Sequence, residues 1–304
     1  MPIDYSIPTE LDDLLSEEDY REIAGYAIDH LSSTLKGITL ADGQIRATNA
    51  EDCTVLINLV NLVKNILVHE KSEWQPQTVE YLEKFSRDQD LEAYLYTDFD
   101  IAQAYLTVRL QPKGIFENPD YPGMTVEAFI YRTDLEDLYT VLSFELPNQF
   151  VMIRREYIAD WRVSDADLFE IARQNLTRKL EDIHCRQLEA EGATIITMFD
   201  RDYSASMAVD FENNCSACIG SLGSVVCFPS KGSVLIHPIE EAGEFDKAYG
   251  WLVEQVNEFY DEEPGPLTRN FYWYYAGGFE KFGMEWEDKY LTYHIPEALV
   301  RLLS

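Results

Sequence analysis

The sequence predicts an α+β fold in which a helical N-terminal region precedes a mixed, largely antiparallel sheet with packed helices. Apolar stripes with helical spacing and short strand-like apolar runs follow one another irregularly, without the regular rhythm of a doubly wound parallel sheet. Hydrophobic residues make up 46% of the 304 residues, which is enough to fill cores and too much for a disordered chain. A chain of this length forms one large domain or two moderate ones, and we expect two.

Residues 1–110 are expected to form a mainly helical domain. Ser16 with three carboxylates after it is typical of a helix start. A second helix is predicted to open at residues 49–52 and to present one apolar face as far as Leu67. Residues 111–123 contain three prolines and two glycines, which break regular structure, so we place a linker there.

Residues 124–304 are expected to form an α+β domain. Strands are predicted from apolar runs bounded by turn residues, and helices from apolar stripes that follow a capping residue. In chain order, the predicted elements are strands at 125–131, 139–146 and 150–153, a helix capped by Ser164 with its stripe ending at Ile183, a strand at 194–199, a hairpin of 224–228 with 234–237, a helix at 244–260, and an aromatic strand at 271–275 that pairs with 283–286.

The charge of the chain excludes several classes of partner. The sequence has 24 Lys and Arg residues against 55 Asp and Glu residues, a formal net charge of −31, and residues 1–30 and 240–263 are especially acidic. A strongly negative field repels phosphate backbones and acidic lipid headgroups, so we expect neither a nucleic-acid nor a membrane partner. A basic protein is the partner that this charge favours.

Targeting features and cysteine usage indicate a cytoplasmic location. No apolar run approaches the roughly 18 residues that span a bilayer. The first residues lack the basic start and the apolar stretch of a secretory signal. The five cysteines form an odd set without framework spacing, which is typical of reduced thiols in a reducing compartment.

Several segments of the C-terminal part resemble a known family. These are the segment 135–139 with its strand, the Pro147-Asn148 turn, the helix region 160–176, and further on the stretches 202–206 and 223–235. Together they resemble the YtpQ-like bacterial family, whose domain is called domain of unknown function 1444. The resemblance implies an α+β domain over residues 124–304. The family offers no activity to carry over.

The clearest candidate site is a polar loop after the strand predicted at 194–199. It concentrates carboxylate, guanidinium, phenol and hydroxyl groups, which suit a small polar recognition patch. The patch consists of Asp200, Arg201, Asp202, Tyr203, Ser204 and Ser206. Alternatively, Asp200 and Asp202 form a D-x-D pair that holds a divalent cation in a metal-dependent enzyme.

The cysteines offer a second candidate. Cys215, Cys218, Cys227 and His237 have the residue types of a zinc site. The C-x-x-C pair alone is also a candidate redox dithiol, whereas unconnected thiols are the plain alternative.

The sequence contains no H-E-x-x-H, G-x-S-x-G, P-loop or G-x-G-x-x-G motif, so we expect no catalytic residue and no cofactor. The leading hypothesis is a non-enzymatic binding or interaction protein that recognises a basic partner, as an immunity or inhibitor protein does. The alternatives are the metal-dependent enzyme and a structural protein that self-associates through its aromatic strand. The sequence predicts no particular oligomeric state.

Overall fold

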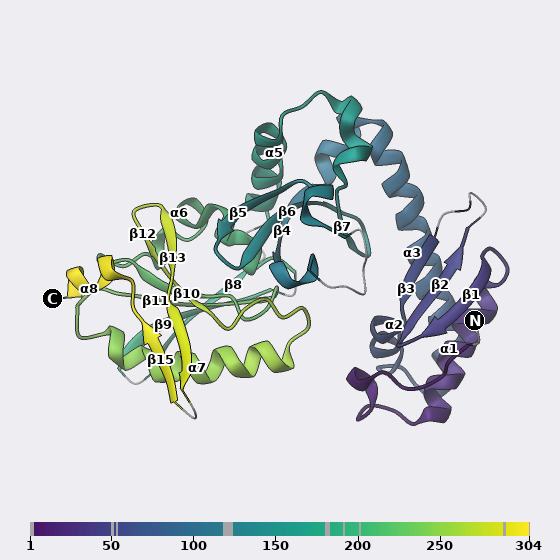
Figure 1. The fold of residues 1–304 in the computed structure, drawn as a ribbon, viewed down its shortest axis with the longest axis horizontal. Helices are drawn as coiled ribbons and strands as arrows, with labels where there is room; N and C mark the ends of the chain where they lie inside the picture. The colour runs from purple at the N-terminus through teal and green to yellow at the C-terminus, as the bar shows by residue number, and fades with distance from the viewer. Residues whose placement is uncertain are drawn as a thin grey trace. The chain divides into compact units, whose positions relative to one another are not determined.

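The computed structural model confirms the α+β class (Figure 1). It describes residues 3–49, 52, 54–117, 124–179, 183–190, 192–200, 202–287 and 290–303. The chain divides into two compact units, which are treated separately below. Unit 1 comprises Met1–Ala93 with Pro147–Gln149, and unit 2 comprises Tyr94–Leu146 with Phe150–Ser304. Of the helices in the described part of the chain, none combines the length and apolar character needed to cross a membrane.

Unit 1 packs helices against a small antiparallel sheet. Its helices are α1 (Glu17–Leu31), α2 (Leu59–Ile66) and most of α3 (Trp74–Thr97), and its strands are β1 (Lys36–Ala41), β2 (Gln44–Thr48) and β3 (Thr54–Asn58), in the order β1-β2-β3. As predicted, Ser16 caps α1, and its hydroxyl oxygen accepts the Asp19 N–H at 3.2 Å. Tyr20, Ile45 and Leu62 are fully buried in the core between helices and sheet.

The helix expected from residues 49–52 onward is wrong in its first part. Residues Thr54–Asn58 form a strand paired with β2, and the helix begins at Leu59, where the Asn58 side chain accepts the Val60 N–H at 2.8 Å. The β-branched residues before Asn58 prefer the pleated surface of a sheet, and the asparagine caps the helix that follows.

Unit 2 contains two larger antiparallel sheets and a hairpin. The four-stranded sheet comprises β4 (Leu106–Pro112), β5 (Tyr131–Leu135), β6 (Leu138–Glu145) and β7 (Phe150–Met152), with β4, β5 and β7 all pairing with β6. The six-stranded sheet has the order β13-β12-β10-β11-β9-β8, from Gly278–Lys281, Phe271–Tyr275, Ser224–Cys227, Ser233–Pro238, Ala193–Phe199 and His184–Ala190. The hairpin pairs β14 (Gly283–Glu287) with β15 (Tyr290–His294).

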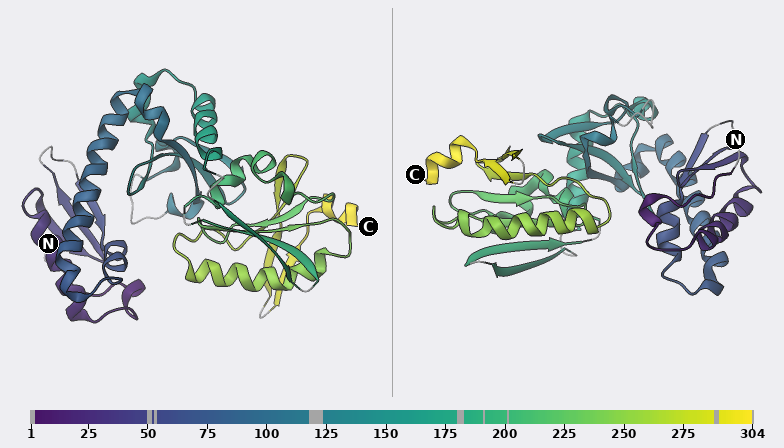
Figure 2. Two further views of the ribbon diagram at one scale, coloured as in Figure 1. Left: turned by 180° about the vertical axis from the view of Figure 1, so that it is seen from behind. Right: turned by 60° about the horizontal axis from the view of Figure 1, so that its bottom comes forward.

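Helices cover both sheets of unit 2. The helix α5 (Asp165–Thr177), capped by Ser164 as predicted, packs against β4. The helix α7 (Phe245–Glu262) runs along one face of the six-stranded sheet, as the views of Figure 2 show. The short elements are α4 (Phe99–Ala102), α6 (Phe211–Asn214) and α8 (Glu297–Leu303).

A single apolar cluster joins the two sheets. Val226, Val234 and Ile236 from the face of the six-stranded sheet away from α7 pack in one core with Leu110 and Leu138 of the four-stranded sheet. The turn and short helices that follow β9 lie in the same core. Each sheet therefore buries apolar side chains against the other, which fixes the loops at their junction.

Four further expectations in the C-terminal part are wrong. The linker expected at residues 111–123 begins inside β4, and β4 pairs with β6 along its whole length. The boundary between the two units instead follows Ala93. Pro112 is tolerated because it is the last residue of that strand. The strand expected at 125–131 is a 3-10 turn at Val126–Ala128, followed by β5. Residues 118–123 lie outside the described residues.

The remaining two corrections concern the six-stranded sheet. The helix that follows Ser164 ends at Thr177, and His184–Ala190 form the edge strand β8. The strand β12 pairs with β10 and β13 rather than with residues 283–286. Its side chains from Tyr272 to Tyr274 are buried, so they fill cores instead of forming a free edge for self-association.

Candidate functional site

The polar turn after β9 is built around Asp200. Its Oδ1 accepts the backbone N–H groups of Asp202 and Tyr203, each at 2.9 Å. The Asp200 N–H itself donates to the Gly232 carbonyl at 3.0 Å, in the loop between β10 and β11. Asp200 is thus a turn-forming residue. Arg201 lies outside the described residues.

Tyr203 fastens this turn to the four-stranded sheet. Its hydroxyl donates to the Glu145 carboxylate at the end of β6, and the Lys179 ammonium donates to the Tyr203 oxygen at 3.1 Å. Lys179 also forms an ion pair with Glu145. Burial and the bond to Glu145 raise the pKa of Tyr203 well above its ordinary value, so the phenol stays a neutral donor. The ring meets Phe150 edge to face at 5.8 Å.

Arg109 is the most unusual side chain of unit 2. It lies on β4, is only 5% exposed, and places its guanidinium carbon 4.0 Å from the centre of the Phe150 ring. Its Nη1 is fully buried and has no hydrogen-bond acceptor, and within the described chain Arg109 forms no ion pair. Burial lowers the pKa of Arg109, while Asp202 and Tyr203 oppose that shift. Because an arginine stays protonated in proteins, this is a buried positive charge with an open hydrogen-bond donor.

Lys231 brings a second cation to the same place. It sits in the loop between β10 and β11, where its carbonyl accepts the Ala205 N–H at 3.2 Å and its N–H donates to the Gly265 carbonyl at 3.0 Å. Burial and the positive charge of Arg109 lower the pKa of Lys231 to about 8, and Asp202 opposes the shift. The ammonium forms no ion pair with any described carboxylate. The charge of Asp202 therefore acts on both Arg109 and Lys231, although neither forms an ion pair with a described carboxylate.

Other polar groups near Arg109 and in the adjoining turn also lack partners. The hydroxyl of Ser204 is fully buried without a hydrogen-bond partner in the described structure, and Ser206 is buried beside it. Thr107 and Gln111 flank Arg109 on the same face of β4, and each has a buried side-chain oxygen without a partner. Buried polar atoms normally have a hydrogen-bond partner, and an ordered water or a bound ion is among the partners that such atoms can take. Lys231, Asp202 and Tyr203 are partly exposed.

The structure does not bring the predicted zinc ligands together. Cys215 and Cys218 lie in the core between the two sheets, whereas Cys227 belongs to the opposite face of the six-stranded sheet, beneath α7. His237 shares the face of Cys227, and its Nδ1 lies 2.9 Å from the Thr194 carbonyl. Strand alternation separates the two pairs by the thickness of the sheet. Among the described residues, no three or more His, Cys, Asp or Glu side chains are grouped to hold a metal ion, so Asp200 and Asp202 are not placed as a cation site either.

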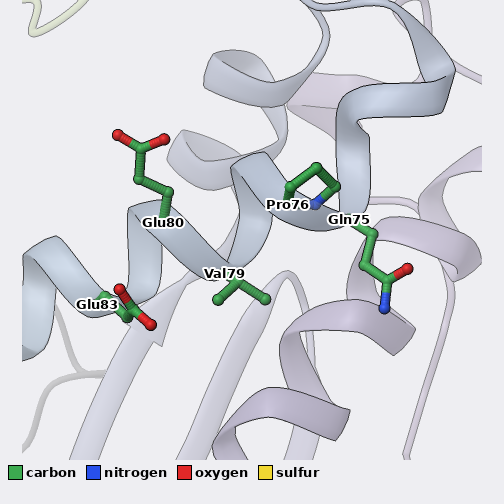
Figure 3. Close-up of a pocket in the computed structure, with 5 residues that line it drawn as sticks. All are labelled: Gln75, Pro76, Val79, Glu80 and Glu83. Carbon is green, nitrogen blue, oxygen red and sulfur yellow. The ribbon is translucent and has the colours of Figure 1, made fainter.

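A depression on α3 in unit 1 has fewer polar groups that could bind one ligand than the surroundings of Arg109. It is lined by Gln75, Pro76, Val79, Glu80 and Glu83, whose polar side chains point in different directions (Figure 3). Glu80 is already paired with Lys84 at 2.8 Å. Without convergent polar groups it is a weaker candidate than the surroundings of Arg109.

Comparisons with known proteins add no assignment. No protein-family model matches the chain, and no curated protein or solved structure matches it. The resemblance to the YtpQ-like family stays a prediction.

The sequence predicts the polar turn after β9, but it does not predict the residues that contact this turn. Arg109 carried a signal, since it is the only charged residue in the strand sequence Leu106–Pro112. Lys231, Glu145 and Lys179 carried none, because only the tertiary fold brings them to the turn.

The bond between Tyr203 and Glu145 should stabilise unit 2 measurably. We expect Tyr203→Phe to lower the free energy of unfolding by about 1–3 kcal/mol, since the Glu145 carboxylate loses a partly buried donor. Urea denaturation measures this, with Tyr157→Phe, an exposed tyrosine, as the control. Equal stability of both variants would contradict the role of the hydroxyl.

Proposed function

We propose that the protein is a non-enzymatic binding protein that takes a small oxyanion, such as a carboxylate, sulfate or phosphate group, between Arg109 and Lys231. The observation that carries the proposal is the buried Nη1 of Arg109, which has no acceptor among the described residues and whose charge acts on Lys231, a second cation without an ion-pair partner in the same part of the chain. An oxyanion supplies the missing acceptor and the missing charge together.

Other arginines of the same chain show what a structural arginine looks like. Arg155 makes two hydrogen bonds to the Asp165 carboxylate, at 3.1 and 2.7 Å. Arg173 pairs with both Glu170 and Asp210. A guanidinium that serves packing alone is expected to find such a partner, because a buried unpaired charge is destabilising.

The acidity of the chain limits the size of the ligand. Exposed charges are screened beyond about 8 Å at physiological ionic strength, so a small anion close to Arg109 experiences mainly the local cations. A polyanion extends over the surrounding surface and is repelled by the net charge of −31. The site therefore favours small anions over nucleic acid.

Replacing Arg109 should separate binding from stability. We expect Arg109→Met to weaken sulfate binding by about 10-fold or more, the loss of one charge-assisted hydrogen bond. The free energy of unfolding should stay equal or rise by up to about 4 kcal/mol, because an unpaired buried charge is removed. Calorimetric titration with sulfate and urea denaturation measure the two effects.

Arg155→Met is the matched control, since it removes an exposed arginine that already has a partner. It should leave sulfate binding unchanged. The proposal is wrong if the natural protein binds no sulfate, or if Arg109→Met destabilises the fold as a lost structural ion pair does.

The affinity for sulfate should also depend on pH through Lys231. The pKa of Lys231 is lowered to about 8, so the unliganded site loses this charge as the pH rises above 8. Sulfate keeps its charge throughout, and the dissociation constant should therefore rise up to about tenfold per pH unit above 8. Lys231→Met should abolish this dependence in titrations between pH 6 and 10. A pH-independent affinity in the natural protein would contradict the role of Lys231.

A second candidate function is the recognition of a basic protein, as by an immunity or inhibitor protein. Glu17 and Glu18 are exposed in the first turn of α1 without a partner among the described residues, and Glu240 and Glu241 are exposed before α7. We expect immobilised protein to retain a basic protein from lysate at low salt and to release it at high salt. Neutralising Glu17 and Glu18 to glutamine should weaken capture, whereas Glu156→Gln should not. Salt-independent capture, or capture of no basic protein, would exclude this function.

A further inference from the structure

Two of the five cysteines share one turn in the core of unit 2. Cys215 precedes the 3-10 turn Ser216–Cys218, and the Cys218 N–H donates to the Cys215 carbonyl at 2.7 Å. This hydrogen bond closes a four-residue turn, in which the first and last Cα atoms lie within about 7 Å of each other. Disulfide-bonded cysteines have Cα atoms about 4.4–6.8 Å apart, so the turn brings the two residues into that range. The two residues are 4% and 6% exposed and belong to the same core cluster.

The two thiols also influence one another. The interaction with Cys218, reinforced by burial, raises the pKa of the Cys215 thiol, and the same interaction lowers the pKa of the Cys218 thiol. The Cys215 sulfur has another soft neighbour, the Met207 sulfur at 3.9 Å. Cys218 is therefore the thiol of the pair that is closer to the reactive thiolate form.

A third thiol lies on the same face of the six-stranded sheet. Cys185 is exposed on the edge strand β8 and is paired across the strands with Met198, which packs in the core cluster of Cys215 and Cys218. Burial and, to a smaller extent, Cys218 raise the pKa of the Cys185 thiol. The buried dithiol thus lies near the sheet edge.

We propose that Cys215 and Cys218 form a reversible disulfide when the protein meets hydrogen peroxide, and that they constitute a redox-sensitive modification site. The Cys218 sulfur attacks the peroxide, which gives a sulfenic acid and one water. The Cys215 sulfur then displaces the hydroxyl group from Cys218, which forms the S–S bond and releases a second water. Two thiols and one peroxide give one disulfide and two waters, and an external dithiol restores the thiols.

Counting free thiols before and after oxidation tests the proposal. The full chain is treated with hydrogen peroxide, unfolded, and alkylated with N-ethylmaleimide for intact mass measurement. The reduced chain has five cysteines and should take five adducts, whereas the oxidised chain should take three and regain five after treatment with dithiothreitol. Tandem mass spectrometry of the tryptic peptide 202–231 should place the loss of two hydrogens between Cys215 and Cys218.

Variants identify the pair. Cys215→Ser and Cys218→Ser should each abolish the reversible loss of two thiols, whereas Cys185→Ser should retain it. The proposal is overturned if five adducts persist after peroxide treatment, or if the bond joins Cys185 or Cys227 instead. It is also overturned if Cys185→Ser removes the effect, because the exposed thiol is then the oxidised group.

Discussion

The burial of one arginine charge constrains the junction between the two sheets of unit 2. Arg109 cannot lose its proton, so the groups around it must accommodate a cation in a poorly solvated place. The Phe150 ring lies under the guanidinium, the Asp202 charge acts on it, and Glu145 holds the neighbouring Tyr203. The turn after β9 and the loop between β10 and β11 are bonded to each other around this charge. Among the described residues one guanidinium nitrogen of Arg109 has no hydrogen-bond acceptor, unlike the guanidinium groups of Arg155 and Arg173, which are paired with carboxylates.

The distribution of charge explains how an acidic protein can hold an anion. The carboxylates dominate the sequence by 55 to 24, and many of them lie exposed on helices and loops. The cations Arg109 and Lys231 are instead buried or half-buried, where the lower dielectric strengthens their action over short distances. A large anion is repelled by the exposed carboxylates around the site. A small anion close to Arg109 and Lys231 experiences mainly the positive charge of these two residues. The same arrangement leaves the acidic surface free for a basic partner, so the two candidate functions do not compete for residues.

Local signals in the sequence predicted local structure well. The caps Ser16 and Ser164, the strand β6 and the hairpin of β10 with β11 are each specified by a few consecutive residues, and the structure confirms them. The sequence of the polar edge strand β8 shows no apolar alternation and therefore does not predict a strand. The short apolar run of β3 fits both the helical and the strand period, so its sequence does not distinguish the two. The partners of the turn at Asp200 come from β4, β6 and a distant loop, which no local pattern specifies. The cysteine set failed as a metal site for a related reason, since spacing along the chain does not say which face of a sheet a side chain occupies.

The most direct test of the oxyanion site is a crystal structure of the protein grown with selenate and measured at the selenium absorption edge. An anomalous peak is expected for a selenate whose oxygens lie within hydrogen-bonding distance of both Arg109 Nη1 and Lys231 Nζ. A well-defined Arg109 whose Nη1 instead bonds directly to a protein carboxylate, with no selenium peak beside it, would show that the charge is structural and that the site takes no anion.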